Sequence, residues 1–128
     1  MMSYYLAIDI GASSGRHILG SIEDGKIKLE EIYRFENGIS KIGDEYCWDI
    51  QGLFNEIKKG IKKCKEIGKV PKNIGIDTWA VDFVLLDEND EMLGNAVAYR
   101  DDRTDGYMEK AFQVIPQDML YLYTGIQF

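Results

Sequence analysis

Apolar residues predict three consecutive strands at the start of the chain. The runs Tyr4–Ile10, Arg16–Ile22 and Lys26–Phe35 carry apolar side chains in the patterns that are typical of half-buried or buried strands. Small residues separate the first two runs, and Glu23-Asp24-Gly25 is a suitable hairpin turn before the third. We therefore predict a three-stranded antiparallel meander over residues 4–35.

A helix is predicted after a loop. Asn37-Gly38 ends the third strand, and we expect a loop from there to about Trp48. Asp49 is a suitable N-cap, because its carboxylate can accept a free backbone N–H, and Gly68 is a suitable stop. The apolar residues between them share one helix face: Ile50, Leu53, Phe54, Ile57, Ile61 and Cys64. The lysines in the latter half of this helix are interpreted as a solvated face.

The rest of the chain predicts further strands and one more helix. Two strand-like runs, Asn73–Trp79 and Val81–Leu86, are followed by a solvated turn over residues 87–90. A short run at Ala96–Tyr99 comes next, then a helix from Thr104 to about Ile115 with Asp102 or Thr104 near its start, and an aromatic segment over residues 121–128. This order predicts an α/β fold in which a helix covers one face of a mixed sheet.

A carboxylate stands at the end of the first strand. Burying an unpaired Asp9 would cost several kcal/mol, so this side chain needs a cation, a donor network or water. The small residues after it, from Gly11 to Gly15, allow backbone N–H groups to approach phosphate oxygens, and Ser13, Ser14 and Arg16 add donors. The alternative is an ordinary hairpin turn beside a solvated aspartate.

Composition and charge narrow the classes of function. A chain of 128 residues that is 45% hydrophobic can form the core of one domain, and its net charge of −7 argues against a nucleic-acid partner. Cys47 and Cys64 have no metal-ligand spacing and predict reduced thiols in a cytoplasmic protein. No signal peptide is evident, and no apolar run reaches the roughly 20 residues that cross a bilayer, so we expect no membrane partner.

Four segments together resemble one family. They are Ala7–Arg16 (AIDIGASSGR), Tyr46–Asp49 (YCWD), Ile74–Asp87 (IGIDTWAVDFVLLD) and Ala98–Thr104 (AYRDDRT). In this order they resemble the N-terminal part of the rhamnulokinase branch of the FGGY carbohydrate kinases. The resemblance implies the ribonuclease-H-like fold of the actin-like ATPase superfamily. It also implies that residues 1–128 form the N-terminal part of the first kinase domain, with the second domain absent from this chain.

The resemblance assigns roles to particular residues. It implies that Asp9 faces magnesium and that Gly11, Ala12, Ser13, Ser14, Gly15 and Arg16 bind the phosphates of ATP. Trp79 and Ala80 match the sugar contact, although the usual rhamnulokinase pattern has glycine where this chain has Ala80, and Asp82 is expected to line the same cleft. The alternatives are that Trp79 is a core aromatic, that Asp82 pairs with an arginine, and that residues 99–104 form a self-paired salt-bridge loop.

The implied activity is ATP-dependent phosphorylation of a sugar. L-Rhamnulose, phosphorylated on its terminal hydroxyl to L-rhamnulose 1-phosphate, is the first expectation, and xylulose, fuculose and glycerol are alternatives. The catalytic base is expected beyond the position of Phe128, so the chain by itself is predicted to be inactive, and its uncovered apolar surface to favour self-association. The alternative from another class is a non-catalytic nucleotide-binding module on the same fold.

Overall fold

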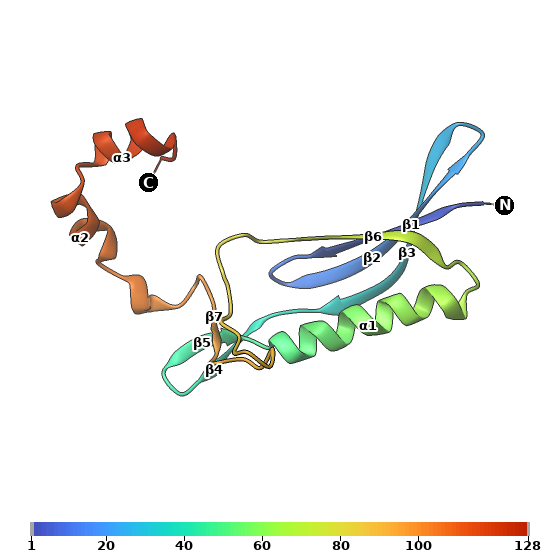
Figure 1. Ribbon diagram of the computed structural model, residues 1–128, viewed down its shortest axis with the longest axis horizontal. Helices are drawn as coiled ribbons and strands as arrows, with labels where there is room; N and C mark the ends of the chain where they lie inside the picture. Colours follow the sequence, from blue (N-terminus) through green and yellow to red (C-terminus); the bar gives the residue numbers. More distant parts are fainter. Residues whose placement is uncertain (1, 128) are drawn as a thin grey trace.

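A four-stranded mixed sheet forms the body of the molecule (Figure 1). The computed structural model describes residues 2–127. The strands are β1 (Tyr4–Ile10), β2 (Ser14–Glu23), β3 (Lys26–Glu36) and β6 (Pro71–Thr78), in the order β3-β2-β1-β6. β1 and β2 are antiparallel, as are β2 and β3, whereas β6 runs parallel to β1. The predicted meander and the mixed character of the sheet are confirmed.

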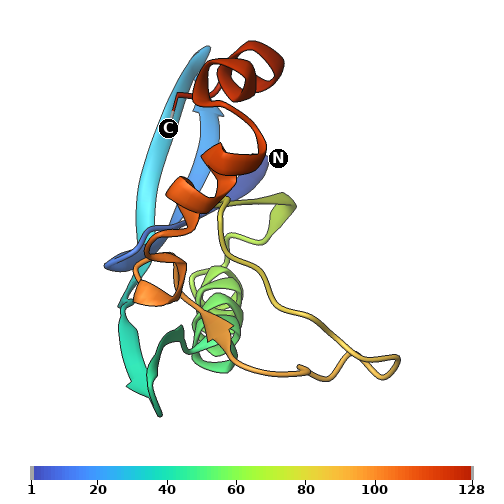
Figure 2. The same cartoon turned by 90° about the vertical axis from the view of Figure 1, so that its left-hand side faces the viewer.

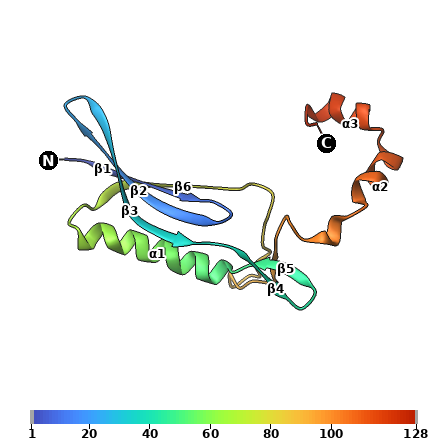
Figure 3. The ribbon, with the colours of Figure 1, turned by 180° about the vertical axis from the view of Figure 1, so that it is seen from behind.

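Helix α1 (Ile50–Glu66) covers one face of this sheet, as Figure 3 shows from behind. It begins as predicted, with Asp49 Oδ1 accepting the N–H of Gly52 at 2.8 Å, and the chain leaves it through Gly68 at φ 71°. Residues of β1, β2, β3 and α1 form the core under the helix: Leu6, Ile8, Ile10, Leu19, Phe35 and Cys64. Each large apolar side chain buried there stabilises the fold by about 1.5–3 kcal/mol.

The single histidine lies inside this core. His17 is fully buried, its Nε2 lies 3.2 Å from the carbonyl oxygen of Ile57, and its Nδ1 has no partner among the described residues. The ring packs at Gly60, where a Cβ would overlap it. Burial lowers the pKa of His17 below its ordinary value. The imidazole therefore acts as a neutral packing group between β2 and α1.

A second, smaller sheet replaces the predicted loop before α1. It contains β4 (Ile39–Ile42), β5 (Glu45–Trp48) and β7 (Ala96–Val97), all antiparallel. The loop prediction for this segment was wrong, because β4 and β5 form a hairpin around Gly43 at φ 63°. β5 is the central strand, between β4 and the much later β7, and the hairpin is mostly exposed except at Cys47 and Trp48.

The segment after β6 is irregular. The prediction of a strand at Val81–Leu86 was wrong: these residues form no strand, and an isolated bridge joins Leu86 to Met92. These residues are mostly apolar, but none of the described strands pairs with them, and Phe83 remains 72% exposed. The predicted turn at Asp87 is confirmed, since Asp87 Oδ1 accepts the N–H groups of Asn89 and Glu91 at 2.8 and 2.9 Å.

The last third of the chain ends in short helices that stand apart from both sheets (Figure 1), and Figure 2 shows the molecule from the side on which they lie. They are the 3-10 turn η1 (Asp102–Thr104), α2 (Tyr107–Val114) and α3 (Gln117–Thr124). The predicted helix is confirmed in part, but it starts after Gly106 at φ 74° rather than at Asp102 or Thr104, and α3 was not predicted. None of the helices in residues 2–127 is long and apolar enough to cross a membrane.

Candidate functional site

The turn between β1 and β2 has an unusual set of hydrogen bonds. The N–H of Gly11 donates to the carbonyl of Ser14 at 2.9 Å. The carbonyl of Gly11 instead accepts the side-chain amide of Asn37 at 2.9 Å, and the carbonyl of Ser13 accepts the backbone N–H of Asn37 at 3.0 Å. Within residues 2–127, no described hydrogen bond occupies the N–H groups of Ala12 and Ser13. The turn therefore presents free backbone donors of the kind that bind anions.

Gly15 lies beneath the turn rather than in it. It is a buried residue of β2, placed opposite Ile10 of β1 and Phe35 of β3. A Cβ at this position would overlap the ring of Phe35. The missing side chain of Gly15 thus makes room for a core aromatic, which is a packing requirement separate from the approach of a phosphate.

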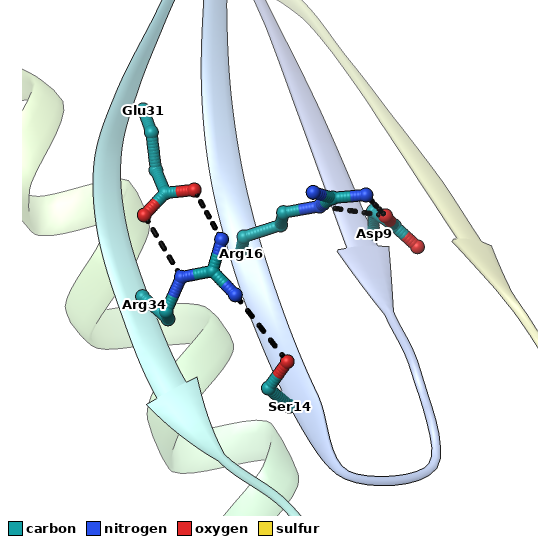
Figure 4. A network of polar contacts seen from close by, with 5 residues as sticks. All are labelled: Asp9, Ser14, Arg16, Glu31 and Arg34. Carbon is teal, nitrogen blue, oxygen red and sulfur yellow. Dashed lines mark hydrogen bonds and ion pairs between the residues drawn. The ribbon is translucent and has the colours of Figure 1, made fainter.

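Asp9 lies on the sheet face opposite α1, where it pairs with Arg16 (Figure 4). The two residues are cross-strand neighbours, and Asp9 Oδ2 lies 2.9 Å from Arg16 Nε and 2.8 Å from Nη2. Both side chains remain accessible, at 45% for Arg16 and 41% for Asp9. Arg16 is therefore the partner that the Asp9 carboxylate was expected to need, and the carboxylate remains accessible to solvent.

A second arginine lies beside the first. Arg34 of β3 is the cross-strand partner of Arg16, pairs with Glu31 at 2.6 Å, and lies 3.5 Å from the hydroxyl of Ser14 (Figure 4). The hydrogen bond from Arg34 lowers the pKa of Glu31. Arg34 was not among the predicted site residues, because only the register of β3 against β2 places it at the turn.

Asp77 is a further carboxylate that sequence reasoning missed. In the parallel pairing of β1 with β6, Asp77 stands directly beside Asp9, so both acids lie at the carboxyl ends of neighbouring parallel strands on one face. Ligands of α/β proteins commonly bind outside such strand ends. Both acids follow an apolar strand run in the sequence, and that shared position is the signal that could have found Asp77. Residues 2–127 contain no group of three or more His, Cys, Asp or Glu side chains that could hold a metal ion.

Asp82 holds two tryptophans. Its Oδ2 accepts the indole N–H of Trp48 at 2.6 Å, the indole N–H of Trp79 at 2.9 Å and the backbone N–H of Tyr99 at 3.2 Å. The alternative of a pair with an arginine was wrong, because these uncharged donors take the place of a cation. The two indole rings pack with their centroids 4.3 Å apart. Trp48 is buried and was missed, because the segment around it was expected to be a loop.

This aromatic group adjoins the turn between β1 and β2. Ala12 of the turn packs against the cluster of Trp48, Ala96 and Ala98, and Trp79 packs against both this cluster and the main core. A pocket of about 310 Å³ lies under Trp79 and is lined mostly by apolar side chains of α1 and of the segment around Phe83. Ala80 is exposed at the bend that follows β6. The sites predicted at Asp9–Arg16 and at Trp79–Asp82 are thus brought together at one end of the sheet.

The segment from Tyr99 to Arg103 is held by one buried carboxylate. Asp101 accepts the backbone N–H groups of Tyr46 and Arg103 at 2.8 and 2.9 Å, and these bonds lower the pKa of Asp101. No ion pair within this segment is found in the described part of the chain. The alternative of a self-paired salt-bridge loop is therefore replaced by a loop that Asp101 ties to β5.

Comparisons with protein families and with curated relatives point to the same family. Residues 4–128 match the model for the N-terminal domain of the FGGY family of carbohydrate kinases. The rhamnulokinase of Halalkalibacterium halodurans is 58% identical over 127 residues, which are 99% of this chain and 27% of the relative. The rhamnulokinase of Bacillus subtilis is 46% identical over 124 residues, which are 97% of this chain and 26% of the relative. The chain thus spans roughly a quarter of the length of these curated relatives.

Solved structures share the fold. Gluconate kinase from Lactobacillus acidophilus superposes with a TM-score of 0.78 at 16% identity, over 98% of this chain and 25% of that one. Glycerol kinase from Plasmodium falciparum with ADP superposes with a TM-score of 0.61 at 18% identity, over 94% of this chain and 25% of that one. These likenesses confirm the predicted α/β fold, which this chain shares with about a quarter of each of these kinases.

Proposed function

The chain belongs to the FGGY family of carbohydrate kinases, and we propose that it is the N-terminal part of an ATP-dependent kinase that phosphorylates L-rhamnulose to L-rhamnulose 1-phosphate. One observation carries the proposal. An accessible carboxylate, Asp9, and a turn with free backbone donors lie at the same end of the sheet as the Trp79–Asp82 group. The substrate follows from the relatives, which are named rhamnulokinases at 58% and 46% identity.

The turn is proposed to bind nucleotide phosphates. Ala12 and Ser13 offer backbone N–H groups, Gly11 and Ser14 close the turn, and Arg16 supplies a cationic side chain beside it. Backbone donors suit this task in a chain with a net charge of −7, because they attract phosphate oxygens without a broad basic surface. Gly15 contributes by keeping Phe35 packed beneath the turn.

Asp9 is proposed to face magnesium. Its carboxylate is accessible, its described hydrogen bond and ion pair are with Arg16, and Asp77 stands beside it. Two carboxylates suit Mg²⁺, which commonly takes one or two of them and fills its other positions with water and substrate phosphates. Bound magnesium would neutralise charge on the transferred phosphoryl group. Asp9 and Asp77 would orient the ion's water shell, and Arg16 would be free to contact phosphate.

The Trp79 end of the site is proposed to contact the sugar. Trp79 offers a half-buried ring, Asp82 a carboxylate and Ala80 an exposed position at the bend. The side chain that accepts the proton of the sugar hydroxyl is proposed to lie outside these 128 residues, so the chain alone should not transfer phosphate. The domain assignment, the cytoplasmic location and self-association stay predictions.

A chimera tests this proposal. The segment of the Halalkalibacterium halodurans rhamnulokinase that matches this chain is replaced by the 127 matching residues of this chain. ADP release is then measured with magnesium-ATP and L-rhamnulose, L-fuculose, D-xylulose or glycerol, beside the 128-residue chain alone. We expect activity of the chimera that prefers L-rhamnulose, and none from the chain alone.

Each other outcome has a definite meaning. A folded chimera that prefers another sugar would refute the substrate and keep the kinase, and Ala80→Gly would then be tested for restoring L-rhamnulose. A folded chimera that is silent with every sugar would refute the kinase function and favour a non-catalytic nucleotide-binding module. Reproducible sugar-dependent ADP release by the 128-residue chain would refute the claim that the proton acceptor lies elsewhere.

A further inference from the structure

The hairpin between β1 and β2 lacks one of its expected hydrogen bonds. Where two antiparallel strands are joined by a tight turn, the closing residues commonly exchange a pair of backbone bonds. Gly11 and Ser14 make only one in the described chain, from the N–H of Gly11 to the carbonyl of Ser14 at 2.9 Å. The reciprocal bond is not made, and the carbonyl of Gly11 accepts the Asn37 side-chain amide at 2.9 Å. The N–H of Ser14 is thereby released from the turn.

The planarity of the peptide bond extends this effect to neighbouring groups. In a trans peptide, the carbonyl oxygen of one residue and the N–H of the next point in opposite directions. Because Asn37 binds the carbonyls of Gly11 and Ser13, the N–H groups of Ala12 and Ser14 both point away from Asn37. One residue at the end of β3 therefore sets the orientation of two peptide units in the turn.

We propose that Asn37 is a positioning residue of the phosphate turn, which holds the carbonyls of Gly11 and Ser13 so that the N–H groups of Ala12 and Ser14 stay available to a phosphate. This inference rests on the proposed function of the turn. Asparagine suits the task because its short side chain carries an amide donor, and its own backbone N–H supplies the second bond. Asn37 touches no phosphate in this scheme and acts through the turn.

The sequence around Asn37 hides this role. Asn37-Gly38 has the composition of an ordinary strand end, which is how the sequence was interpreted. The contact spans 26 positions in the chain, and only the pairing of β3 with β2 brings Asn37 beside Gly11.

Amide hydrogen exchange of the 128-residue chain, followed by NMR, tests the inference without any ligand. In Asn37→Ala, the freed carbonyl of Gly11 should accept the N–H of Ser14 and complete the hairpin. We expect the Ser14 amide to exchange at least fivefold more slowly than in the wild type. The backbone N–H at position 37 keeps its bond to Ser13 and should exchange as before. A residue needed only for stability would give faster exchange at Ser14.

Two further variants test whether the change at Ser14 is specific to the Asn37 side-chain amide. Asn55→Ala removes an exposed asparagine of α1 and should leave the turn unchanged. If Asn37→Ala does not fold, Asn37→Asp decides, because the aspartate has nearly the same shape but has no amide donor. Exchange at Ser14 that is unchanged or faster in a folded Asn37 variant overturns the inference.

A titration with magnesium-ATP separates the inference from the proposed function. Amide shifts at Ala12, Ser13 and Ser14 are expected in the wild-type chain, with an affinity that falls about fivefold in Asn37→Ala, the equivalent of one hydrogen bond of about 1 kcal/mol. No shift at the turn in the wild type would refute its phosphate role. Slower exchange of the Ser14 amide in unliganded Asn37→Ala would still confirm that Asn37 positions the peptide units of the turn.

Discussion

The carboxylate of Asp82 accepts the indole N–H of Trp79 at 2.9 Å, through the same oxygen that accepts the indole N–H of Trp48 at 2.6 Å. This shared acceptor fixes the relative orientation of two rings whose centroids lie 4.3 Å apart. Trp48 is buried and Trp79 is half-buried. Asp82 thus fixes the half-buried ring of Trp79 against the buried ring of Trp48, next to the turn that contains Ala12.

Removal of the Asp82 carboxylate should release this pair. The chain has only two tryptophans, so a circular-dichroism couplet between two indoles can come only from Trp48 and Trp79. In Asp82→Ala we expect the couplet to be lost or strongly reduced, whereas Asp82→Asn, which keeps a side-chain oxygen as acceptor, should retain part of it. Asp87→Ala, in the exposed hairpin tip, serves as the control. A couplet of wild-type size in Asp82→Ala would contradict this role.

Alanine at Gly15 should destabilise the fold. The new methyl group would overlap the Phe35 ring, and overpacking of a core costs about 1–3 kcal/mol. Gly75→Ala is the matched control, because Gly75 is also a strand glycine but has open space around its Cα. Urea unfolding of both variants measures the difference. Equal free energies of unfolding for Gly15→Ala and Gly75→Ala would show that Gly15 is not needed for packing.

His17 should make stability depend on pH. Burial lowers its pKa in the folded state below the ordinary value of 6.5, so the unfolded chain binds a proton first as the pH falls. The contribution of this neutral ring is complete above about pH 6.5 and is lost as the pH falls from there toward the folded-state pKa. Urea unfolding of wild type and His17→Gln between pH 5 and pH 8 should show a steeper loss for the wild type. Parallel pH profiles would contradict this assignment.

The uncovered sheet face should cause self-association. Leu29 is 71% exposed on the face opposite α1, and Ile27 near it is 74% exposed. Large exposed apolar patches favour association, so the sedimentation coefficient of the 128-residue chain should rise with concentration. Leu29→Lys should weaken this rise, whereas Val70→Lys, which changes an exposed loop residue, should not. A concentration-independent monomer would refute the prediction.

Local patterns predicted the parts of the fold that depend on neighbouring residues. The meander of β1, β2 and β3 follows from turns and apolar runs, and α1 follows from the Asp49 cap and one apolar face. The strand β5 pairs with β7, which lies about 50 positions later, and the four-residue strands of the β4–β5 hairpin are too short to give a clear periodic signal. The run at Val81–Leu86 has a strand pattern but no partner strand, and it stays irregular.

The residues of the candidate site also fall into those that local sequence predicts and those that only the tertiary structure brings in. Asp9 and the turn after it are close in the sequence, so their spacing was informative. Asn37, Asp77 and Trp48 reach the site through strand register and ring packing, which the order of residues does not reveal. The family resemblance supplied a role for Trp79, but it did not show that Asp82 accepts hydrogen bonds from the indoles of both Trp79 and Trp48.

The most direct test of the account is the turnover number of the chimeric kinase with Asp9→Asn. The substitution removes the carboxylate charge that is proposed to orient the magnesium water shell, and loss of such an outer ligand typically costs about 10–100-fold in activity. Asp24→Asn is the control, because it makes the same change in an exposed hairpin where φ is 50° and asparagine is well tolerated. We expect a loss of this size in Asp9→Asn alone. Equal turnover in Asp9→Asn, Asp24→Asn and the unsubstituted chimera would remove Asp9 from the mechanism.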